Sequence, residues 1–208
     1  MSTWISDLRV ALALAAGLAL AGCLSPPGEA AKPAVRQAAL GGGAVILTAP
    51  RGYCLDPRSL RRSGGRVALL ASCESLTGTP GISVLPALMT VSVVPEGDAG
   101  APSPEGLARA VAPARTASGG MRDGLAHVQV LSGGEAVLPG GDPRHWRGAR
   151  AVAGHLAGLA LYAPKGSPLA GPEGRGLLRA LSDGLQAGAG RAATRRRSPF
   201  AGLFPVSN

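Results

Sequence analysis

Two cysteines, Cys54 and Cys73, constrain the folding of this chain more than any other feature of its sequence. They lie in a stretch from Ala49 to Cys73 that begins where one apolar run stops and ends where a second one stops. In an oxidising compartment such a pair predicts a disulfide, whereas in the cytosol it favours metal binding or catalysis. The interpretation of the pair therefore depends on whether the chain is exported.

Residues 1–22 predict export. Arg9 supplies a positive charge before an uninterrupted apolar run from Val10 to Ala21. The run is shorter than the stretch of about 20 apolar residues that spans a bilayer, and it suits the apolar region of a signal peptide. It ends in Leu-Ala-Gly-Cys, which resembles the bacterial lipobox, and the resemblance makes Cys23 the lipidated first residue of the mature chain. The alternative is an ordinary cleaved signal peptide followed by an unrelated cysteine.

The lipobox resemblance also implies a location. Acyl chains on Cys23, palmitate among them, hold a protein at a membrane, and two or more chains anchor it stably. The next residue is Leu24, whereas lipoproteins retained in the inner membrane often carry aspartate at this position. We therefore expect a cell-envelope protein that is lipid-anchored to the outer membrane and faces the periplasm.

Composition divides the rest of the chain into three parts. Residues 23–43 are rich in proline, glycine and alanine without periodicity, which predicts a flexible tether behind the lipidated cysteine. Residues 44–187 alternate apolar segments with turn signals and are long enough for a single domain with a core. Residues 188–208 include the run Arg195–Arg197 and predict a basic, disordered tail, either solvated or in contact with a membrane surface.

Export makes a disulfide between Cys54 and Cys73 the favoured prediction. A loop of about 20 residues closed in this way contributes roughly 3 kcal/mol to stability in the chain-entropy model. Thiol redox catalysis favours a Cys-x-x-Cys spacing that the chain lacks, and no histidine lies near either cysteine in sequence to complete a metal site. The Gly-Tyr-Cys pattern at 52–54 together with Cys73 resembles uncharacterised proteobacterial lipoproteins, a resemblance that implies no known activity.

Apolar runs and capping signals predict alternating strands and helices. Strands are expected at 44–48, 66–73, 87–94, 125–131, 135–138, 146–153 and 156–163. Helices are expected to begin at Asp56-Pro57, Ser103-Pro104 and Gly171-Pro172. The glycines of residues 114–124 predict a loop, and Gly133-Gly134 predicts a hairpin turn.

This order of elements predicts an α+β fold, in which two main helices pack on one face of a mostly antiparallel sheet. The arrangement resembles the Mog1/PsbP-like fold, in which small lipoproteins and accessory proteins lay two helices against such a sheet. The resemblance covers roughly residues 44–187 and rests on the order of the elements.

The charge of the chain indicates an acidic partner. Its formal net charge is +9 at pH 7, carried almost entirely by arginine. A basic surface attracts anions, and an exported protein does not normally meet nucleic acid. The expected partners are therefore the membrane itself, an anionic envelope component such as phospholipid headgroups, or another envelope protein.

The segment from Asp142 to Arg147 is the densest polar and aromatic cluster of the chain. Arg144, His145 and Trp146 could stack on or clamp an anionic or planar ligand, and Tyr53 could contact a ligand beside the disulfide. The alternative is that both aromatic side chains pack in the core while the arginines face solvent.

Recognisable catalytic and metal-binding motifs are missing from the sequence. It contains no Gly-x-Ser-x-Gly turn, no histidine-rich zinc motif, no phosphate loop and no acidic calcium loop. We therefore expect no metal and no cofactor, and we predict a non-catalytic binding or assembly module. The alternative is an envelope hydrolase that pairs a histidine, such as His145, with a serine or an aspartate.

Replacing Cys23 by alanine tests the predicted anchor. The Cys23→Ala variant should carry no acyl chains, because the lipid is attached to this sulfur, and it should leave the membrane fraction. Mass spectrometry of the mature N-terminus and membrane fractionation measure the two effects, with Ser25→Ala as the control. Acylation of the Cys23→Ala variant would contradict the lipobox interpretation.

Overall fold

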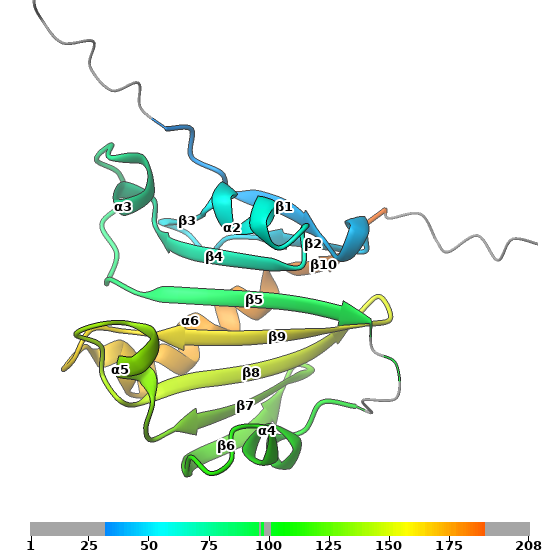
Figure 1. Cartoon of the computed structure of the whole chain (residues 1–208), viewed down its shortest axis with the longest axis vertical. Coiled ribbons are helices and arrows are strands. Elements are labelled where there is room, and N and C mark those ends of the chain that lie inside the picture. Colours follow the sequence, from blue (N-terminus) through cyan, green and yellow to red (C-terminus); the bar gives the residue numbers. More distant parts are fainter. Residues whose placement is uncertain (1–31, 96, 98–100, 190–208) are drawn as a thin grey trace, which may run out of the picture. The chain divides into compact units, whose positions relative to one another are not determined.

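The computed structural model describes residues 32–95, 97 and 101–189 (Figure 1). The predicted signal peptide, Cys23, residues 24–31 of the predicted tether and residues 190–208 of the tail lie outside these ranges. The described part has an α+β fold. Two antiparallel sheets, one of seven strands and one of three, form its framework.

The larger sheet has the strand order β3-β4-β5-β9-β8-β7-β6. In chain order its strands are β3 Tyr53–Leu55, β4 Val67–Ser72, β5 Leu88–Pro95, β6 Thr116–Arg122, β7 Leu125–Val130, β8 His145–Val152 and β9 His155–Tyr162. The central pair, β5 and β9, runs antiparallel from the pair Leu88 and Tyr162 to the pair Pro95 and His155. These strands confirm five of the predicted ones: those near 66–73, 87–94, 125–131, 146–153 and 156–163.

The smaller sheet has the order β1-β2-β10. Its strands are β1 Gln37–Leu40, β2 Val45–Thr48 and β10 Leu185–Ala187. Strand β2, predicted at 44–48, therefore pairs with its neighbour in sequence on one side and with the last described strand on the other.

Five helices accompany the sheets in the described ranges. They are α2 Pro57–Arg62, α3 Cys73–Thr77, α4 Pro104–Ala110, α5 Gly134–Val137 and α6 Pro172–Asp183, with 3-10 turns at Gly41–Gly43 and Pro168–Ala170. The predicted starts of α2 and α4 are confirmed, because the side chains of Asp56 and Ser103 accept hydrogen bonds from the backbone nitrogens of Arg58 and Gly106. None of the helices in the described part is both long and apolar enough to cross a bilayer.

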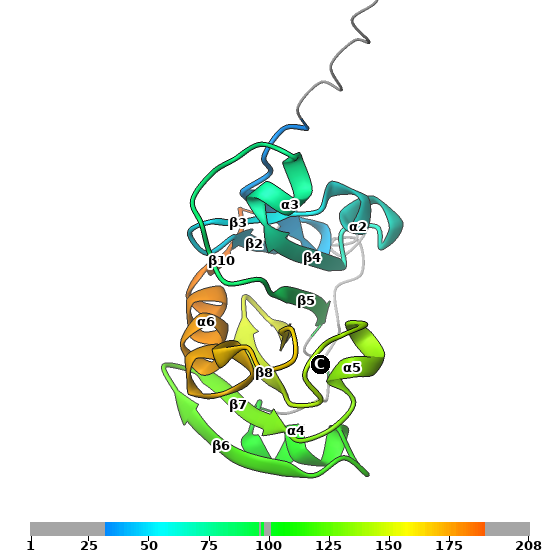
Figure 2. The ribbon, with the colours of Figure 1, turned by 90° about the vertical axis from the view of Figure 1, so that its left-hand side faces the viewer.

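The two main helices, α4 and α6, lie on opposite faces of the larger sheet (Figure 2). Successive side chains of a strand point to opposite faces. Trp146 of β8 points to the α6 side, where its Nε1 donates a hydrogen bond to the carbonyl oxygen of Gly171. Arg147 points to the other side, where it shares a cavity with Leu107 of α4. The prediction that both helices share one face is wrong, because an apolar stripe shows that a helix packs but not on which face.

A single core joins both sheets and α6. Leu47 of β2, Met89 of β5, and Leu178 and Leu181 of α6 have no exposed surface and belong to one buried cluster. On β5, Met89, Val91 and Val93 are buried, whereas the alternate residues Thr90 and Ser92 are partly or fully exposed. This alternation leaves the face opposite α6 the more polar one.

Cys54 and Cys73 form the predicted disulfide. The bond joins β3 to the first residue of α3, next to the antiparallel pairing of β3 with β4. It therefore closes the segment that contains α2 and β4 and fastens it at the edge of the larger sheet.

Three predictions of local structure are wrong, and one boundary moves. Residues Thr116–Arg122 form strand β6 instead of a loop. Glycine at position 119 allows this strand to pair closely with β7, because a Cβ added there would lie only 3.0 Å from Cγ1 of Val128. Residues Gly134–Val137 form helix α5 instead of a strand, after Gly133 takes a positive φ of 92°. Gly133-Gly134 is therefore not a hairpin turn, and β7 pairs with β8 instead. Strand β1 and the turn behind it lie inside the predicted tether, so the ordered domain begins before Ala44.

Two glycines of α6 should respond in opposite ways to alanine. A Cβ at Gly174 would overlap the carbonyl oxygen of Leu169 and lie 2.7 Å from Cδ1 of Trp146. Gly174→Ala should therefore destabilise the protein by about 1–3 kcal/mol. At Gly176 nothing lies within 4 Å of the added atom, so Gly176→Ala should raise helix propensity and stabilise by up to about 1 kcal/mol. Urea denaturation of both variants measures the difference, and equal effects would contradict the close packing of α6.

Candidate functional site

A cavity of about 410 Å³ opens on the face of the larger sheet opposite α6. Its volume lies in the range of small-molecule sites, which is about 300–1,000 Å³. Thr90 and Ser92 of β5 and His145 and Arg147 of β8 contribute polar groups. Its apolar lining includes Leu107, Ala110 and Val111, from α4 and its C-terminal end. We call this space the Arg147 cavity.

Arg147 is the one cation among the residues that line this cavity, and none of them carries a carboxylate. Its guanidinium carbon lies 5.5 Å from the centroid of the Tyr162 ring, in the geometry of a cation–π contact. Its Nε is buried and has no hydrogen-bond partner within the described residues. Since Arg147 also lines the cavity, an acceptor oxygen bound there could accept a charge-assisted hydrogen bond from its guanidinium group.

His145 lies beside Arg147 on the same face. Its ring stacks on Tyr162 with centroids 5.0 Å apart, and the residue is only 4% exposed. Burial lowers the pKa of His145 from its ordinary value of 6.5, and the nearby charge of Arg147 acts in the same direction. The ring is therefore neutral at pH 7. Its Nδ1 lies 3.3 Å from the carbonyl oxygen of Pro143, to which it donates, so Nε2 is an acceptor.

Arg144 is bound to Asp142 instead of lining the cavity. Its Nε and Nη2 donate to the two carboxylate oxygens at 3.0 and 3.2 Å, and the backbone nitrogen of Gly166 donates to Oδ2 at 3.3 Å. Asp142 is 5% exposed. The hydrogen bond from Arg144 is the main reason that the pKa of Asp142 falls to about 2. The carboxylate thereby joins the start of β8 to the turn after β9.

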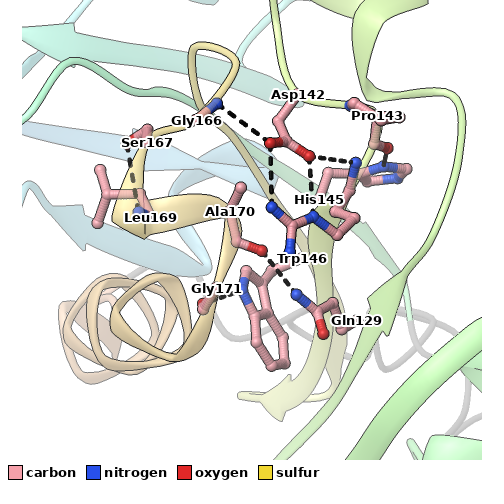
Figure 3. A network of polar contacts seen from close by, with 11 residues as sticks. Gln129, Asp142, Pro143, His145, Trp146, Gly166, Ser167, Leu169, Ala170 and Gly171 are labelled. Atoms are coloured by element: carbon pink, nitrogen blue, oxygen red, sulfur yellow. Dashed lines mark hydrogen bonds and ion pairs between the residues drawn. The ribbon is translucent and has the colours of Figure 1, made fainter.

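Trp146 packs in the core on the α6 side. It is 2% exposed, and its Nε1 lies 2.9 Å from the carbonyl oxygen of Gly171. Beside it, Nε2 of Gln129 donates to the carbonyl oxygen of Ala170 at 2.6 Å (Figure 3). Together with Asp142, these two side chains hold the connection that leads into α6.

Tyr53 belongs to another part of the sheet. It is buried in β3 next to the disulfide, and its hydroxyl donates to the carbonyl oxygen of Leu85 at 2.7 Å. Three strands separate β3 from β8, which corresponds to roughly 19 Å at the usual strand spacing. Of the four predicted ligand contacts, therefore, only His145 lines the Arg147 cavity.

The other two histidines do not provide a catalytic pair. Nδ1 of His155 bonds the carbonyl oxygen of Ala153 at 3.0 Å, and Nδ1 of His127 has no partner in the described part of the chain. Within these residues, no histidine nitrogen bonds a serine or a carboxylate, and no group of three or more metal-ligating side chains gathers. The alternative of a histidine-dependent hydrolase thus has no supporting geometry in the described ranges.

The sequence did not reveal that Tyr162 packs against Arg147 and His145 or that residues of α4 line the cavity. It also did not show that Arg147, and not Arg144 or Trp146, would line it. One signal was available for Arg147. Because side chains alternate along a strand, a strand near 146–153 places His145 and Arg147 on one face and Trp146 on the other. The contribution of α4 carries no such signal, since it depends on which face of the sheet the helix covers.

No family model matches the chain, and no curated protein matches it. Among solved structures, it is similar to the Saccharomyces cerevisiae Ran-binding protein Mog1p at 12% identity and a TM-score of 0.47, over 73% of this chain and 94% of that one. A Mog1 mutant gives 12% identity and a TM-score of 0.46, over 73% and 95% of the two chains. CyanoP, a cyanobacterial PsbP from Synechocystis, gives 9% and 0.42, over 80% and 99%. At this level the similarity carries no conclusion about function.

Removing the Asp142 carboxylate should destabilise the protein in a pH-dependent way. The pKa of Asp142 is lowered from 3.8 to about 2 by folding, so the carboxylate stabilises the fold above pH 3.8 and loses this effect as the pH falls toward 2. Asp142→Asn should therefore cost roughly 2 kcal/mol at pH 7 and much less near pH 2.

Urea denaturation at a series of pH values measures this difference. Glu74→Gln is the control, because Glu74 is an exposed acid of α3 without an ion-pair partner among the described residues. If Asp142→Asn destabilised the protein as much at pH 2 as at pH 7, the charge of this carboxylate would not be the cause.

Proposed function

We propose that this protein is a non-catalytic binding module of the cell envelope, held at a membrane by lipid on Cys23, and that its ligand occupies the Arg147 cavity. The observation that carries the proposal is the half-buried Arg147, which lines a cavity of mixed polar and apolar character and has no ion-pair partner among the described residues. The export signal and the lipobox-like Leu-Ala-Gly-Cys support the location.

The lining of the cavity selects a ligand with one acidic group on an apolar body. Arg147 offers a charge-assisted hydrogen bond, which is stronger than one between neutral groups. No lining carboxylate competes for it. Leu107 and Val111 offer an apolar surface on the other side, where a hydrocarbon portion would be removed from water.

His145 contributes a neutral ring and a hydrogen-bond acceptor to the Arg147 cavity, and it adds no charge. Its ring is neutral at pH 7 and fixed by Tyr162 and Pro143, so it stands beside Arg147 without adding a second cation. Its Nε2 accepts a hydrogen bond from a hydroxyl or amide group of the ligand. The combination fits an anionic envelope metabolite or the acidic terminus of another envelope protein.

Binding of hexanoate and hexanamide tests the charge selection of the cavity. The two probes share an apolar chain and differ in the carboxylate. The full-length protein in neutral detergent should bind hexanoate about tenfold more tightly, because only the carboxylate makes a charge-assisted bond to Arg147. Chemical shifts of the Tyr162 and His145 rings follow both titrations.

The Arg147→Met variant should remove this preference while it keeps the apolar stem of the side chain. Its affinities for hexanoate and hexanamide should become nearly equal. The matched control is Arg62→Gln, since Arg62 is an exposed arginine of α2 outside the cavity. Equal binding of both probes by the unmodified protein, or an unchanged preference in Arg147→Met, would overturn the assignment of this cavity.

A further inference from the structure

A second, smaller hollow lies on the α6 side of the larger sheet. Its volume is about 230 Å³, and it lies between the β6–β7 hairpin and the first two turns of α6. Arg122, Arg175 and Arg179 line it together with His127, while Pro172 and Gly176 complete its α6 side. We call it the arginine hollow. The Arg147 cavity lies on the other face of the sheet, so the two share no lining residue.

The charges around the arginine hollow do not balance. Asp123 is the acid paired with its arginines in the described part: its Oδ2 lies 2.7 Å from Nη2 of Arg179 and 3.8 Å from Nε of Arg122. Arg175 has no ion-pair partner among the described residues. One carboxylate thus stands against three guanidinium groups, and an anion in the hollow would relieve their mutual repulsion.

His127 adds a buried polar group to the same space. It is 7% exposed, and its Nδ1 is buried without a hydrogen-bond partner within the described residues. The residue lines the hollow, so its imidazole lies close enough to respond to the charge of an anion bound there. The imidazole ring lies next to the indole of Trp146, and the two ring centroids are 6.1 Å apart.

We propose that the arginine hollow binds a phosphate-type oxyanion, such as a phosphomonoester group. Guanidinium groups match the tetrahedral oxygens of phosphate with paired hydrogen bonds, and arginine is favoured for this purpose over lysine. The hollow is too small for a large ligand but accommodates one such group, with the rest of the molecule in solvent. Arg175 and Arg122 bind the oxygens, and His127 meets the anion from the sheet.

The proposal includes a defined pH dependence. Burial lowers the pKa of His127, the backbone of Leu125 opposes this effect, and the charge of Arg175 adds to it; the net shift is downward, so the ring is neutral at pH 7 when the hollow is empty. The charged groups that face it are Arg122 and Asp123 from the hairpin and Arg175 and Arg179 from α6. A bound dianion stabilises the imidazolium form and raises the pKa of His127, so affinity should increase as the pH falls.

Titration with inorganic phosphate tests the site directly. The full-length protein in neutral detergent micelles is titrated with phosphate at constant ionic strength, and chloride is the comparison anion. The ring signals of His127 are followed by NMR. We expect a saturable shift with phosphate and none with chloride. Arg175→Gln should weaken binding about tenfold, because one charge-assisted pair is lost.

Arg175 is exposed on α6, so its replacement by glutamine leaves the core untouched. The matched control is Arg109→Gln, an exposed arginine of α4 on the other side of the sheet, which should bind phosphate like the unmodified protein. The absence of a phosphate-specific shift, or equal affinity in Arg175→Gln and Arg109→Gln, would overturn the proposal. Neither result depends on what the Arg147 cavity binds.

A second titration separates two sources of the oxyanion. Dihexanoyl phosphatidic acid, added to micelles of dihexanoyl phosphatidylcholine, presents the same group on a lipid. If the hollow serves a lipid headgroup, this compound should bind about tenfold more tightly than inorganic phosphate; if it serves a soluble phosphate compound, the two affinities should be similar. Both outcomes support the oxyanion site, provided that Arg175→Gln weakens the binding. If neither probe binds, the proposal is overturned.

Discussion

The packing of the Trp146 indole against Gly174 of α6 is the contact on which the rest of the described structure depends. The helix can approach this closely because Gly174 carries no side chain, and the indole nitrogen is satisfied by the carbonyl oxygen of Gly171. Gln129 and Asp142 fasten the chain that leads into the helix. This contact therefore sets how closely α6, which Leu178 and Leu181 anchor in the core, approaches the sheet and the β6–β7 hairpin.

Because side chains alternate along each strand, the two proposed binding sites lie on opposite faces of the larger sheet. On β8, Trp146 belongs to the core beneath α6, while Arg147 on the opposite face is left with a buried nitrogen that no described residue satisfies. On β7, His127 stands in the corresponding position on the α6 side. Each face thus holds a basic group whose hydrogen-bonding capacity exceeds what the described chain supplies, and this excess underlies both proposed binding sites.

Much of the fold could be predicted from the sequence, because capping residues, prolines and apolar runs act locally. Asp56-Pro57 and Ser103-Pro104 start helices as predicted, and the disulfide followed from the expected compartment. Strand β6 could not be predicted, because Gly119 serves close pairing with Val128, a neighbour that only the fold supplies. The sites were harder still: Arg144 and Trp146 stand next to His145 in sequence, yet their side chains are committed to Asp142 and to the core.

The small sheet has a consequence for the order in which the protein can mature. Strand β2 lies between β1, its near neighbour in sequence, and β10, the last strand of the described chain. Until Leu185–Ala187 has emerged, one edge of β2 has no partner in this sheet, and the core residue Leu185 is missing. The smaller sheet and this part of the core can therefore be completed only after nearly the whole described chain is present, whichever end of the chain is available first.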